Sequence, residues 1–202
     1  MLVAVGIGPG DPDLLTVRAV NLIEAADRVF VPGTVARDII APYRTDPVVL
    51  SFPMTADEEY IRRCIEENAR AIVPVAREGL AVFCILGDPN FYGTFGRLCA
   101  VLDETYPEIE YCTVPGVSSI TAFASATGIS LSGGIEITDG SDRTALIRMK
   151  VRRPREMADE LRKSGYTTFI LAERMYMDGQ KIYHTDELPE ESAYFSILYA
   201  GK

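Results

Sequence analysis

The chain has 202 residues, of which 48% are hydrophobic, 9% aromatic and 24% charged, and its net charge at pH 7 is −9. These fractions are typical of a folded globular protein and exclude a disordered or collagen-like chain. The negative charge disfavours non-specific binding to nucleic acid or to an anionic membrane surface. The single His and the four widely spaced Cys form no two-His motif and no C-x-x-C pair, so the sequence predicts neither a metal site nor a disulfide framework.

No apolar run reaches the ~18–20 residues of a membrane-spanning helix. Met1 is followed directly by an apolar segment, without the basic region and cleavage site of a signal peptide. We therefore expect a cytoplasmic protein whose cysteines are small buried hydrophobic residues.

The first half of the sequence alternates apolar strands with helices. Strands are predicted at 2–7, 28–32, 48–53, 80–86 and 108–114, and helices at 13–26, 57–78, 90–105 and 117–127. Pro74 lies inside the second of these helices, where we expect it to kink the helix or to separate its last turn. The alternation indicates parallel βαβ units with helices on both faces of one sheet.

The pattern changes after Gly128, where loop-rich segments follow. Strands are predicted at 144–151, 167–173, 181–185 and 193–199, with one helix at 154–164. This half is typical of an α+β unit with hairpins. The sequence thus predicts an α/β fold of two domains, residues 1–115 and 116–202, with a ligand cleft between them.

Three loops follow predicted strands and are the candidate binding elements, because open α/β sheets bind ligands at the carboxyl ends of their strands. They are Gly6-Ile-Gly-Pro-Gly-Asp-Pro, Leu86-Gly-Asp-Pro-Asn-Phe-Tyr and Val114-Pro-Gly-Val-Ser-Ser.

Each loop also has an alternative interpretation. The first loop resembles a dinucleotide fingerprint only poorly, because Asp11 occupies the third glycine position and Pro9 lies inside the turn. In the second, Asp88 suits either a ligand contact or a helix cap. In the third, Ser118 and Ser119 favour a helix cap.

The sequence contains no G-x-S-x-G elbow and no G-K-[ST] phosphate loop, which argues against a serine hydrolase or a P-loop enzyme. His184 is interpreted as a surface or structural residue rather than a catalytic one. No catalytic side chain is therefore predicted.

Taken in order, the three loops and the Leu15-Thr16 pair after the first resemble the tetrapyrrole methylase family. This family includes the S-adenosylmethionine-dependent enzymes of cobalamin and sirohaem synthesis and diphthine synthase. Within it, Phe52-Pro-Met, the Gly87-Asp-Pro-Asn-Phe-Tyr loop and the closing Tyr194-Phe-Ser-Ile-Leu look most like the enzymes that methylate carbon 20 of precorrin-2 or of its cobalt complex. The chain is shorter than those enzymes, mainly in its second domain.

The resemblance implies a homodimer of two-domain chains that bind S-adenosylmethionine in the cleft and release S-adenosylhomocysteine. By position in the family pattern, the cofactor-binding residues are Pro9, Gly87, Asp88, Phe91, Tyr92, Ser118, Ser119, Met149, Ala172 and Met175. Asp88 is expected to be an exposed loop carboxylate, so that Asp88→Ala leaves the fold intact.

A reduced tetrapyrrole carries carboxylates, which require cationic anchors. Arg148, Lys150 and Arg152 alternate along a predicted strand, although a solvated strand face is the favoured explanation, since charge runs are usually solvated. The candidate substrate-binding residues are Gly8, Arg18, Arg97 and Lys150.

Methyl transfer to a ring carbon needs mainly positioning and a dry cleft, so we expect activity without a metal and without His184. Three alternatives remain open: a methylase for another ring position, diphthine synthase acting on a modified histidine, and a non-catalytic dinucleotide-binding protein.

Overall fold

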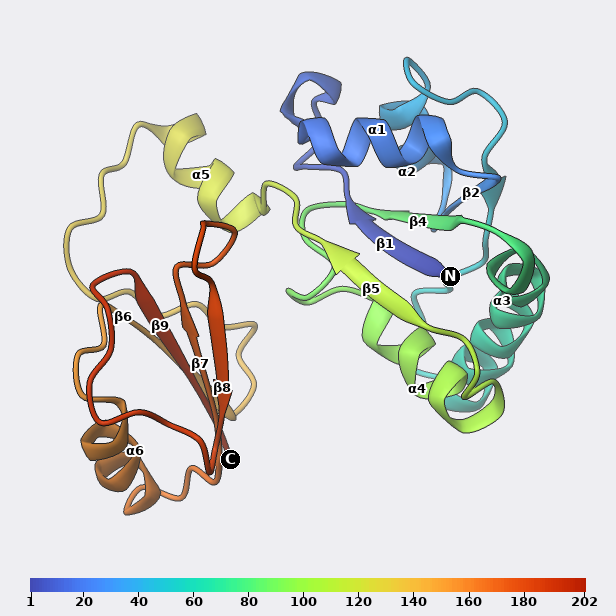
Figure 1. The fold of residues 1–202 in the computed structure, drawn as a ribbon. Helices are drawn as coiled ribbons and strands as arrows, with labels where there is room; N and C mark the ends of the chain where they lie inside the picture. The colour runs from blue at the N-terminus through green and yellow to red at the C-terminus, as the bar shows by residue number, and fades with distance from the viewer. The chain divides into compact units, whose positions relative to one another are not determined.

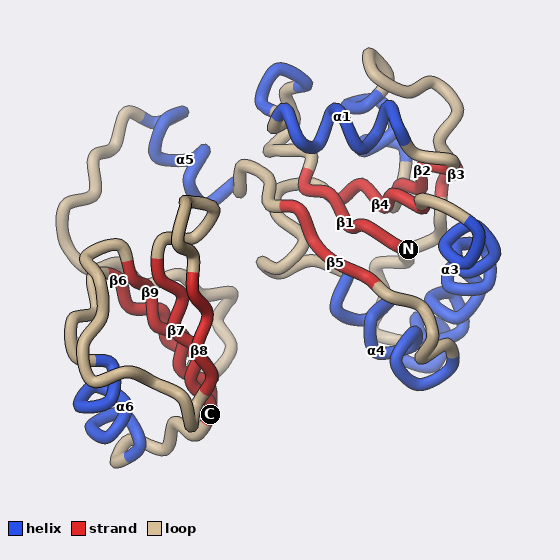
Figure 2. The backbone as a smooth tube through the Cα atoms, in the orientation of Figure 1, coloured by secondary structure: helices blue, strands red, loops and turns tan.

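The computed structural model describes residues 1–202 and divides the chain into two compact units, Met1–Ser132 and Gly133–Lys202. Each unit has its own sheet (Figures 1 and 2). The predicted α/β class is confirmed, with a parallel sheet in the first unit and an antiparallel sheet in the second. The domain boundary at residues 115/116 stays a prediction, and helix α5 lies within the first unit.

The first unit contains a five-stranded parallel sheet in the order β3-β2-β4-β1-β5. Its strands are β1 (Leu2–Gly6), β2 (Arg28–Val31), β3 (Val48–Val49), β4 (Ala81–Ile85) and β5 (Tyr111–Val114). Its helices are α1 (Val17–Ala25), α2 (Thr34–Ile40), α3 (Glu58–Glu78), α4 (Phe95–Thr105) and α5 (Ser119–Thr127). A 3₁₀ turn, Pro12–Leu14, precedes α1.

Helices α1 and α2 cover one face of this sheet, and α3 and α4 cover the other (Figure 1). All five residues of β1 are buried, and alternate side chains enter opposite layers. Leu2 and Ala4 pack toward α3 and α4, whereas Val3 and Val5 pack toward α1 and α2. Burial on both faces explains why the strands are almost continuously apolar.

The second unit contains a four-stranded antiparallel sheet in the order β6-β9-β7-β8. Its elements are β6 (Ala145–Met149), α6 (Pro154–Arg162), β7 (Thr168–Glu173), β8 (Lys181–His184) and β9 (Ser196–Gly201). Ala158 of α6 packs with Phe169 and Leu198 on one face of the sheet. Within this unit the opposite face presents exposed apolar side chains, including Ile147, Met149, Ile182 and Tyr199.

Several element boundaries differ from the sequence-based prediction. Helix α2 was not predicted, because it is short and its N-cap Gly33 offers no capping side chain. Helix α1 begins at Val17 instead of residue 13, after Thr16 caps it by accepting a hydrogen bond from the Ala19 amide at 3.1 Å. Helix α4 begins at Phe95 instead of residue 90, because the preceding loop includes Tyr92 with a φ of 53°.

The late strands also differ from their predicted ranges. Strand β6 ends at Met149, because Lys150 has a φ of 57° and leaves the extended conformation. Strand β9 runs from Ser196 to Gly201, rather than over residues 193–199.

Pro74 does not divide helix α3, which is continuous from Glu58 to Glu78. The prediction of a separated last turn is therefore wrong. Pro74 lies on the exposed side of the helix, so water can reach the carbonyl of Arg70 that would otherwise accept the missing hydrogen bond. No helix of the chain combines the length and the apolar character needed to cross a membrane.

We predict that Pro74→Ala raises the free energy of unfolding by about 1–2 kcal/mol, because Ala restores the amide donor and removes the ring clash inside a helix. Urea denaturation measures the change. Glu67→Ala, at another exposed position of α3, is the matched control and is expected to change stability by less than about 0.5 kcal/mol. Unchanged or lower stability of Pro74→Ala would contradict the prediction.

Candidate functional site at the carboxyl edge of the parallel sheet

The three candidate loops follow three neighbouring strands, β4, β1 and β5. Gly6 pairs with Ile85, and Val5 pairs with Val114, so the strands end at the same level. Because the strands are parallel, their carboxyl ends meet at one edge of the sheet. This register therefore brings the three loops to the same edge of the sheet.

The loops meet through glycine backbones at Gly6, Gly87 and Gly116, which we call the glycine junction. A Cβ atom built on Gly6 would lie 2.5 Å from both the Gly116 nitrogen and the Gly87 oxygen. A Cβ atom on Gly116 would lie 2.2 Å from the same oxygen. Real Cβ atoms do not approach backbone this closely, so Gly6 and Gly116 must lack side chains.

Hydrogen bonds fix the first loop against the second. The Ile7 amide donates to the Ile85 carbonyl at 2.9 Å, and the Gly87 amide donates to the Gly8 carbonyl at 2.8 Å. Gly8 is buried with a φ of 78°, and Gly87 has a φ of 68°, both in the left-handed region that favours glycine. This bond places Pro9, which is half-buried, next to the second loop.

Asp88 connects the second loop to the third. Its side chain accepts hydrogen bonds from the Asn90 amide at 2.9 Å and from the Gly116 amide at 3.2 Å, through different carboxylate oxygens. Asp88 is only 9% exposed. The expectation of an exposed carboxylate is therefore wrong: Asp88 satisfies two backbone donors, and its removal leaves both without that acceptor.

The other predicted residues of the first unit lie around the junction. Ser118 caps α5 by accepting from the Ile120 amide at 3.3 Å, and Ser119 is exposed at the first position of that helix. A Cβ atom on Gly87 would have nothing nearer than the Ser118 Cα and the Ser119 nitrogen, at 3.9 Å. Phe91 and Tyr92 follow with exposures of 48% and 65%. The edge beside Gly87 is thus open, with aromatic side chains exposed on its loop.

The predicted residues of the second unit lie near one end of its sheet. Ile197 of β9 is opposite both Met149 of β6 and Ala172 of β7 in the register. Side chains at matching positions share a face, so Met149 and Ala172 flank Ile197. Met149 is exposed, and Met175 follows β7 in an exposed turn.

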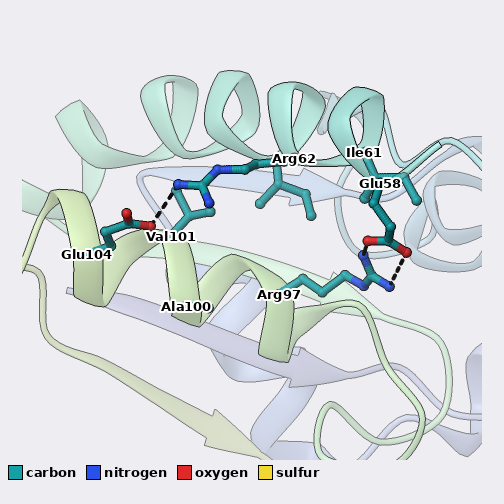
Figure 3. Close-up of a pocket in the computed structure, with 8 residues that line it drawn as sticks. Glu58, Ile61, Arg62, Arg97, Ala100, Val101 and Glu104 are labelled. Carbon is teal, nitrogen blue, oxygen red and sulfur yellow. Dashed lines mark hydrogen bonds and ion pairs between the residues drawn. The ribbon is translucent and has the colours of Figure 1, made fainter.

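Two of the predicted substrate anchors differ in their surroundings. Arg97 donates to Glu58 through two nitrogens at 2.6 and 3.2 Å, and this guanidinium holds the pKa of the Glu58 carboxyl below its usual range. The pair lines a pocket of about 180 Å³ between α3 and α4, which a second pair, Arg62–Glu104 at 2.9 Å, also lines (Figure 3). The charge of Arg97 is therefore already compensated by Glu58. Arg18, in contrast, is exposed in the first turn of α1.

Sequence reasoning missed a second pocket, of about 300 Å³, between the second loop, α4 and the edge strand β5. Its lining residues are Pro89, Asn90, Tyr92, Gly93, Phe95, Gly96, Cys99, Tyr111 and Thr113. The Asn90 side-chain amide donates to the hydroxyl of Thr113, another lining residue, at 3.1 Å. The period-two spacing of Tyr111 and Thr113 on one strand is the signal that places both on the α4 side.

Two ionisable side chains of this second pocket, Cys99 and Tyr111, are protonated at neutral pH. Burial raises the pKa of the Cys99 thiol to about 11. The hydrogen bond that Tyr111 donates to the Asp103 carboxylate, together with burial, raises the pKa of the Tyr111 hydroxyl to about 12. Neither group supplies an anionic nucleophile or base.

No cluster of three or more His, Cys, Asp or Glu side chains is placed to hold a metal ion. His184 lies at the end of β8 and is exposed.

The chain is similar to known proteins over most of its length. The sequence pattern of the family described as tetrapyrrole (corrin/porphyrin) methylases matches residues 1–188. A probable cobalt-precorrin-2 C(20)-methyltransferase from Methanocaldococcus jannaschii is 34% identical over 140 residues, which are 65% of this chain and 59% of that protein. A cobalt-precorrin-4 C(11)-methyltransferase from Priestia megaterium is 34% identical over 155 residues, which are 76% of this chain and 55% of that protein. The chain spans 59% or less of the length of these two relatives.

Solved structures share the fold. A cobalt precorrin-4 methyltransferase aligns with a TM-score of 0.53 at 21% identity, over 99% of this chain and 94% of its own. A putative cobalamin synthesis related protein from Corynebacterium diphtheriae aligns with a TM-score of 0.53 at 14% identity, over 99% of this chain and 97% of its own. The resemblance inferred from the three loops is thereby confirmed at the level of family and fold.

We predict that Gly116→Ala lowers the free energy of unfolding by about 3 kcal/mol or more, because the new methyl group meets the rigid Gly87 carbonyl and Gly6 backbone. Gly96→Ala is the matched control, since a Cβ atom there meets nothing within 4 Å inside a helix, and it is expected to stabilise by up to about 1 kcal/mol. Urea denaturation followed by circular dichroism measures both. Equal stability of the two variants would contradict the close approach at the junction.

Proposed function

Because the chain belongs to the tetrapyrrole (corrin/porphyrin) methylases, we propose that it is an S-adenosylmethionine-dependent methyltransferase acting on a tetrapyrrole. The observation that carries the proposal is the glycine junction, where three loops expose backbone and aromatic surface at the edge at which α/β sheets bind ligands. In the finer form of the proposal, the methylated atom is carbon 20 of precorrin-2 or cobalt-factor II.

The residues at the junction suit this cofactor. The open edge beside Gly87 allows a ligand to approach the backbone, and the N-terminus of α5 at Ser118 and Ser119 favours a carboxylate such as that of methionine. The exposed rings of Phe91 and Tyr92 offer faces to a sulfonium cation. In the second unit, the proposal includes three further cofactor contacts: Met149, Ala172 and Met175.

When bound, the cofactor supplies an electrophilic methyl group: the ring carbon forms the new C–C bond as the C–S bond breaks, the electron pair stays on sulfur, and the ring proton leaves. The chain's own residues have to position the reactants and exclude water. Asp88 contributes by holding the second and third loops in one arrangement through its bonds to the Asn90 and Gly116 amides. No side chain is proposed as a nucleophile.

The similarity to the probable carbon-20 enzyme supports carbon 20 as the methylated position, and the matched region is 59% of that enzyme's length. Methylation of carbon 11 is the second candidate, because the carbon-11 enzyme is also 34% identical and matches more of this chain. As part of the proposal, the enzyme works as a homodimer in the cytoplasm, and a second copy covers exposed apolar surface.

The dinucleotide-binding alternative is disfavoured by the first loop. In a dinucleotide fold the glycine loop opens directly into a helix whose N-terminus binds the pyrophosphate. Here β1 ends at Gly6, a 3₁₀ turn intervenes, and α1 begins only at Val17.

Calorimetry with S-adenosylhomocysteine and with NAD distinguishes the two classes of function. We expect binding of the former alone. Incubation with precorrin-2 or cobalt-factor II and methyl-labelled cofactor, followed by NMR of the product, then identifies the methylated carbon. Binding of NAD without S-adenosylhomocysteine would overturn the proposal, and label at carbon 11 would overturn its finer form.

Asp88→Ala is predicted to weaken S-adenosylhomocysteine binding by about tenfold or more and to lower the free energy of unfolding by about 1–3 kcal/mol, because two backbone amides lose their buried acceptor. Calorimetry and urea denaturation give the two values. Asp139→Ala removes a comparable carboxylate that accepts from the Ser141 amide in an exposed turn, and serves as the control with unchanged affinity. Unchanged affinity of a folded Asp88→Ala variant would remove Asp88 from the site.

A further inference from the structure

Cationic and aromatic side chains gather at one edge of the antiparallel sheet in the second unit. Strands β6 and β7 both run antiparallel to β9, so their carboxyl ends lie at the edge where β9 begins. The C-terminus marked in Figure 1 closely follows the end of β9, so the edge where β9 begins lies at the other end of this sheet. Lys150 follows β6, and Tyr194 and Phe195 precede β9.

Two cations flank one aromatic ring at this edge. The Lys150 Nζ atom lies 5.7 Å, and the Arg152 Cζ atom 5.3 Å, from the centre of the Tyr194 ring. The Phe195 ring stands nearly perpendicular to Tyr194, with 5.3 Å between ring centres. Tyr194 and Phe195 are 47% and 60% exposed. We call Lys150, Arg152, Tyr194 and Phe195 the basic edge cluster.

Backbone hydrogen bonds hold the two segments of the cluster together. The Lys150 amide donates to the Ser196 carbonyl at 2.8 Å, and the Ser192 amide donates to the Arg152 carbonyl at 2.9 Å. The hydroxyls of Ser192 and Ser196 both donate to the Val151 carbonyl at 2.5 Å. The backbone positions of Lys150 and Arg152 relative to Tyr194 are therefore set before any ligand binds, which lowers the entropy cost of binding.

The backbone at this edge is also strained. Lys150, Arg174 and Tyr176 have φ values of 57°, 50° and 60°, in the left-handed region that non-glycine residues rarely occupy. The Arg174 amide donates to the Phe195 carbonyl at 2.7 Å and so joins the β7 turn to the cluster. Strain of this kind persists where the surroundings enforce it, and it is common at ligand-binding sites.

The cations of the cluster differ from most others in the chain because they have no carboxylate partner. Most arginines of this acidic protein form ion pairs, including Arg153 with Glu156 at 3.3 Å and Arg155 with Glu190 at 3.5 Å. Lys150 and Arg152 form none, although they lie around one ring. Two uncompensated positive charges beside the same ring attract an anion.

We propose that the basic edge cluster binds a carboxylate side chain of the tetrapyrrole, with the edge of the macrocycle against Tyr194 and Phe195. This inference rests on the proposed function for the identity of the ligand. Arg152 offers the planar two-donor fork that matches a carboxylate, and Lys150 adds a second positive charge. The exposed aromatic rings add favourable contact with a flat, conjugated ring.

The test uses uroporphyrin III, a tetrapyrrole with eight carboxylates, and follows its binding by fluorescence. The double variant Lys150→Gln/Arg152→Gln keeps side-chain length and removes both charges. We expect its Kd for uroporphyrin to rise about tenfold or more, with a weaker dependence on salt. Its Kd for S-adenosylhomocysteine is expected to stay within about twofold of the wild-type value, since the proposal assigns the cluster to the substrate.

Arg153→Gln/Arg155→Gln is the matched control, because it removes the same charge from adjacent cations that already have carboxylate partners. Its Kd for uroporphyrin is expected to change by less than about threefold. An equal effect of both double variants, or no effect of the first in a folded protein, would overturn the cluster as a carboxylate site. A loss of S-adenosylhomocysteine binding in the first double variant would overturn it in favour of a cofactor contact.

Binding of S-adenosylhomocysteine and binding of uroporphyrin distinguish an error in the proposed function from an error in the carboxylate site. If the wild-type protein binds uroporphyrin through the cluster but binds no S-adenosylhomocysteine, the proposed function is wrong and the carboxylate site stands. If it binds S-adenosylhomocysteine and transfers methyl groups while the first double variant binds uroporphyrin normally, the site is wrong and the proposed function stands.

Discussion

The close approach of three backbone segments at Gly6, Gly87 and Gly116 is the constraint on which the first unit's site depends. Side chains are excluded there because added Cβ atoms on Gly6 or Gly116 would lie within 2.5 Å of the neighbouring backbone. That proximity allows the Asp88 carboxylate to reach the Gly116 amide, and it brings the N-terminus of α5 close to the Gly87 loop. The shape of the edge is consequently set by the close backbone contacts together with the Asp88 carboxylate that joins two of the loops.

The two units differ in the kind of polar group they offer. At the glycine junction the polar groups are mainly backbone amides and carbonyls, together with one carboxylate that the backbone already satisfies. Such neutral groups suit a zwitterion, whose opposite charges each find a dipole. The second unit instead offers full positive charges beside exposed rings, which suit a flat polyanion. In an acidic chain, cations without carboxylate partners are well suited to bind such an anion.

Much of this architecture could be predicted from the sequence because it depends on local patterns. Buried parallel strands are apolar runs, and the loops after β1, β4 and β5 contain the glycine and proline residues that mark turns. The burial of Asp88 could not be predicted, since it depends on a contact with Gly116 that only the folded sheet creates. Lys150 was predicted to lie within a strand, because the alternation of Arg148, Lys150 and Arg152 is a local pattern typical of a strand. The strand instead ends at Met149, and the backbone turns at Lys150. Helix α2 carries no local start signal at Gly33.

The strand order has a consequence for how the first unit is made. Strand β5 pairs with β1 on the outside of the sheet, although β1 is synthesised first and β5 last of the five strands. Until residues 111–114 have left the ribosome, one side of the wholly apolar β1 is an open edge with unpaired amides and carbonyls. The growing chain therefore carries an aggregation-prone strand through most of the synthesis of this unit. Addition of β5 closes that edge, and the Gly116 segment that follows it completes the glycine junction in the same step.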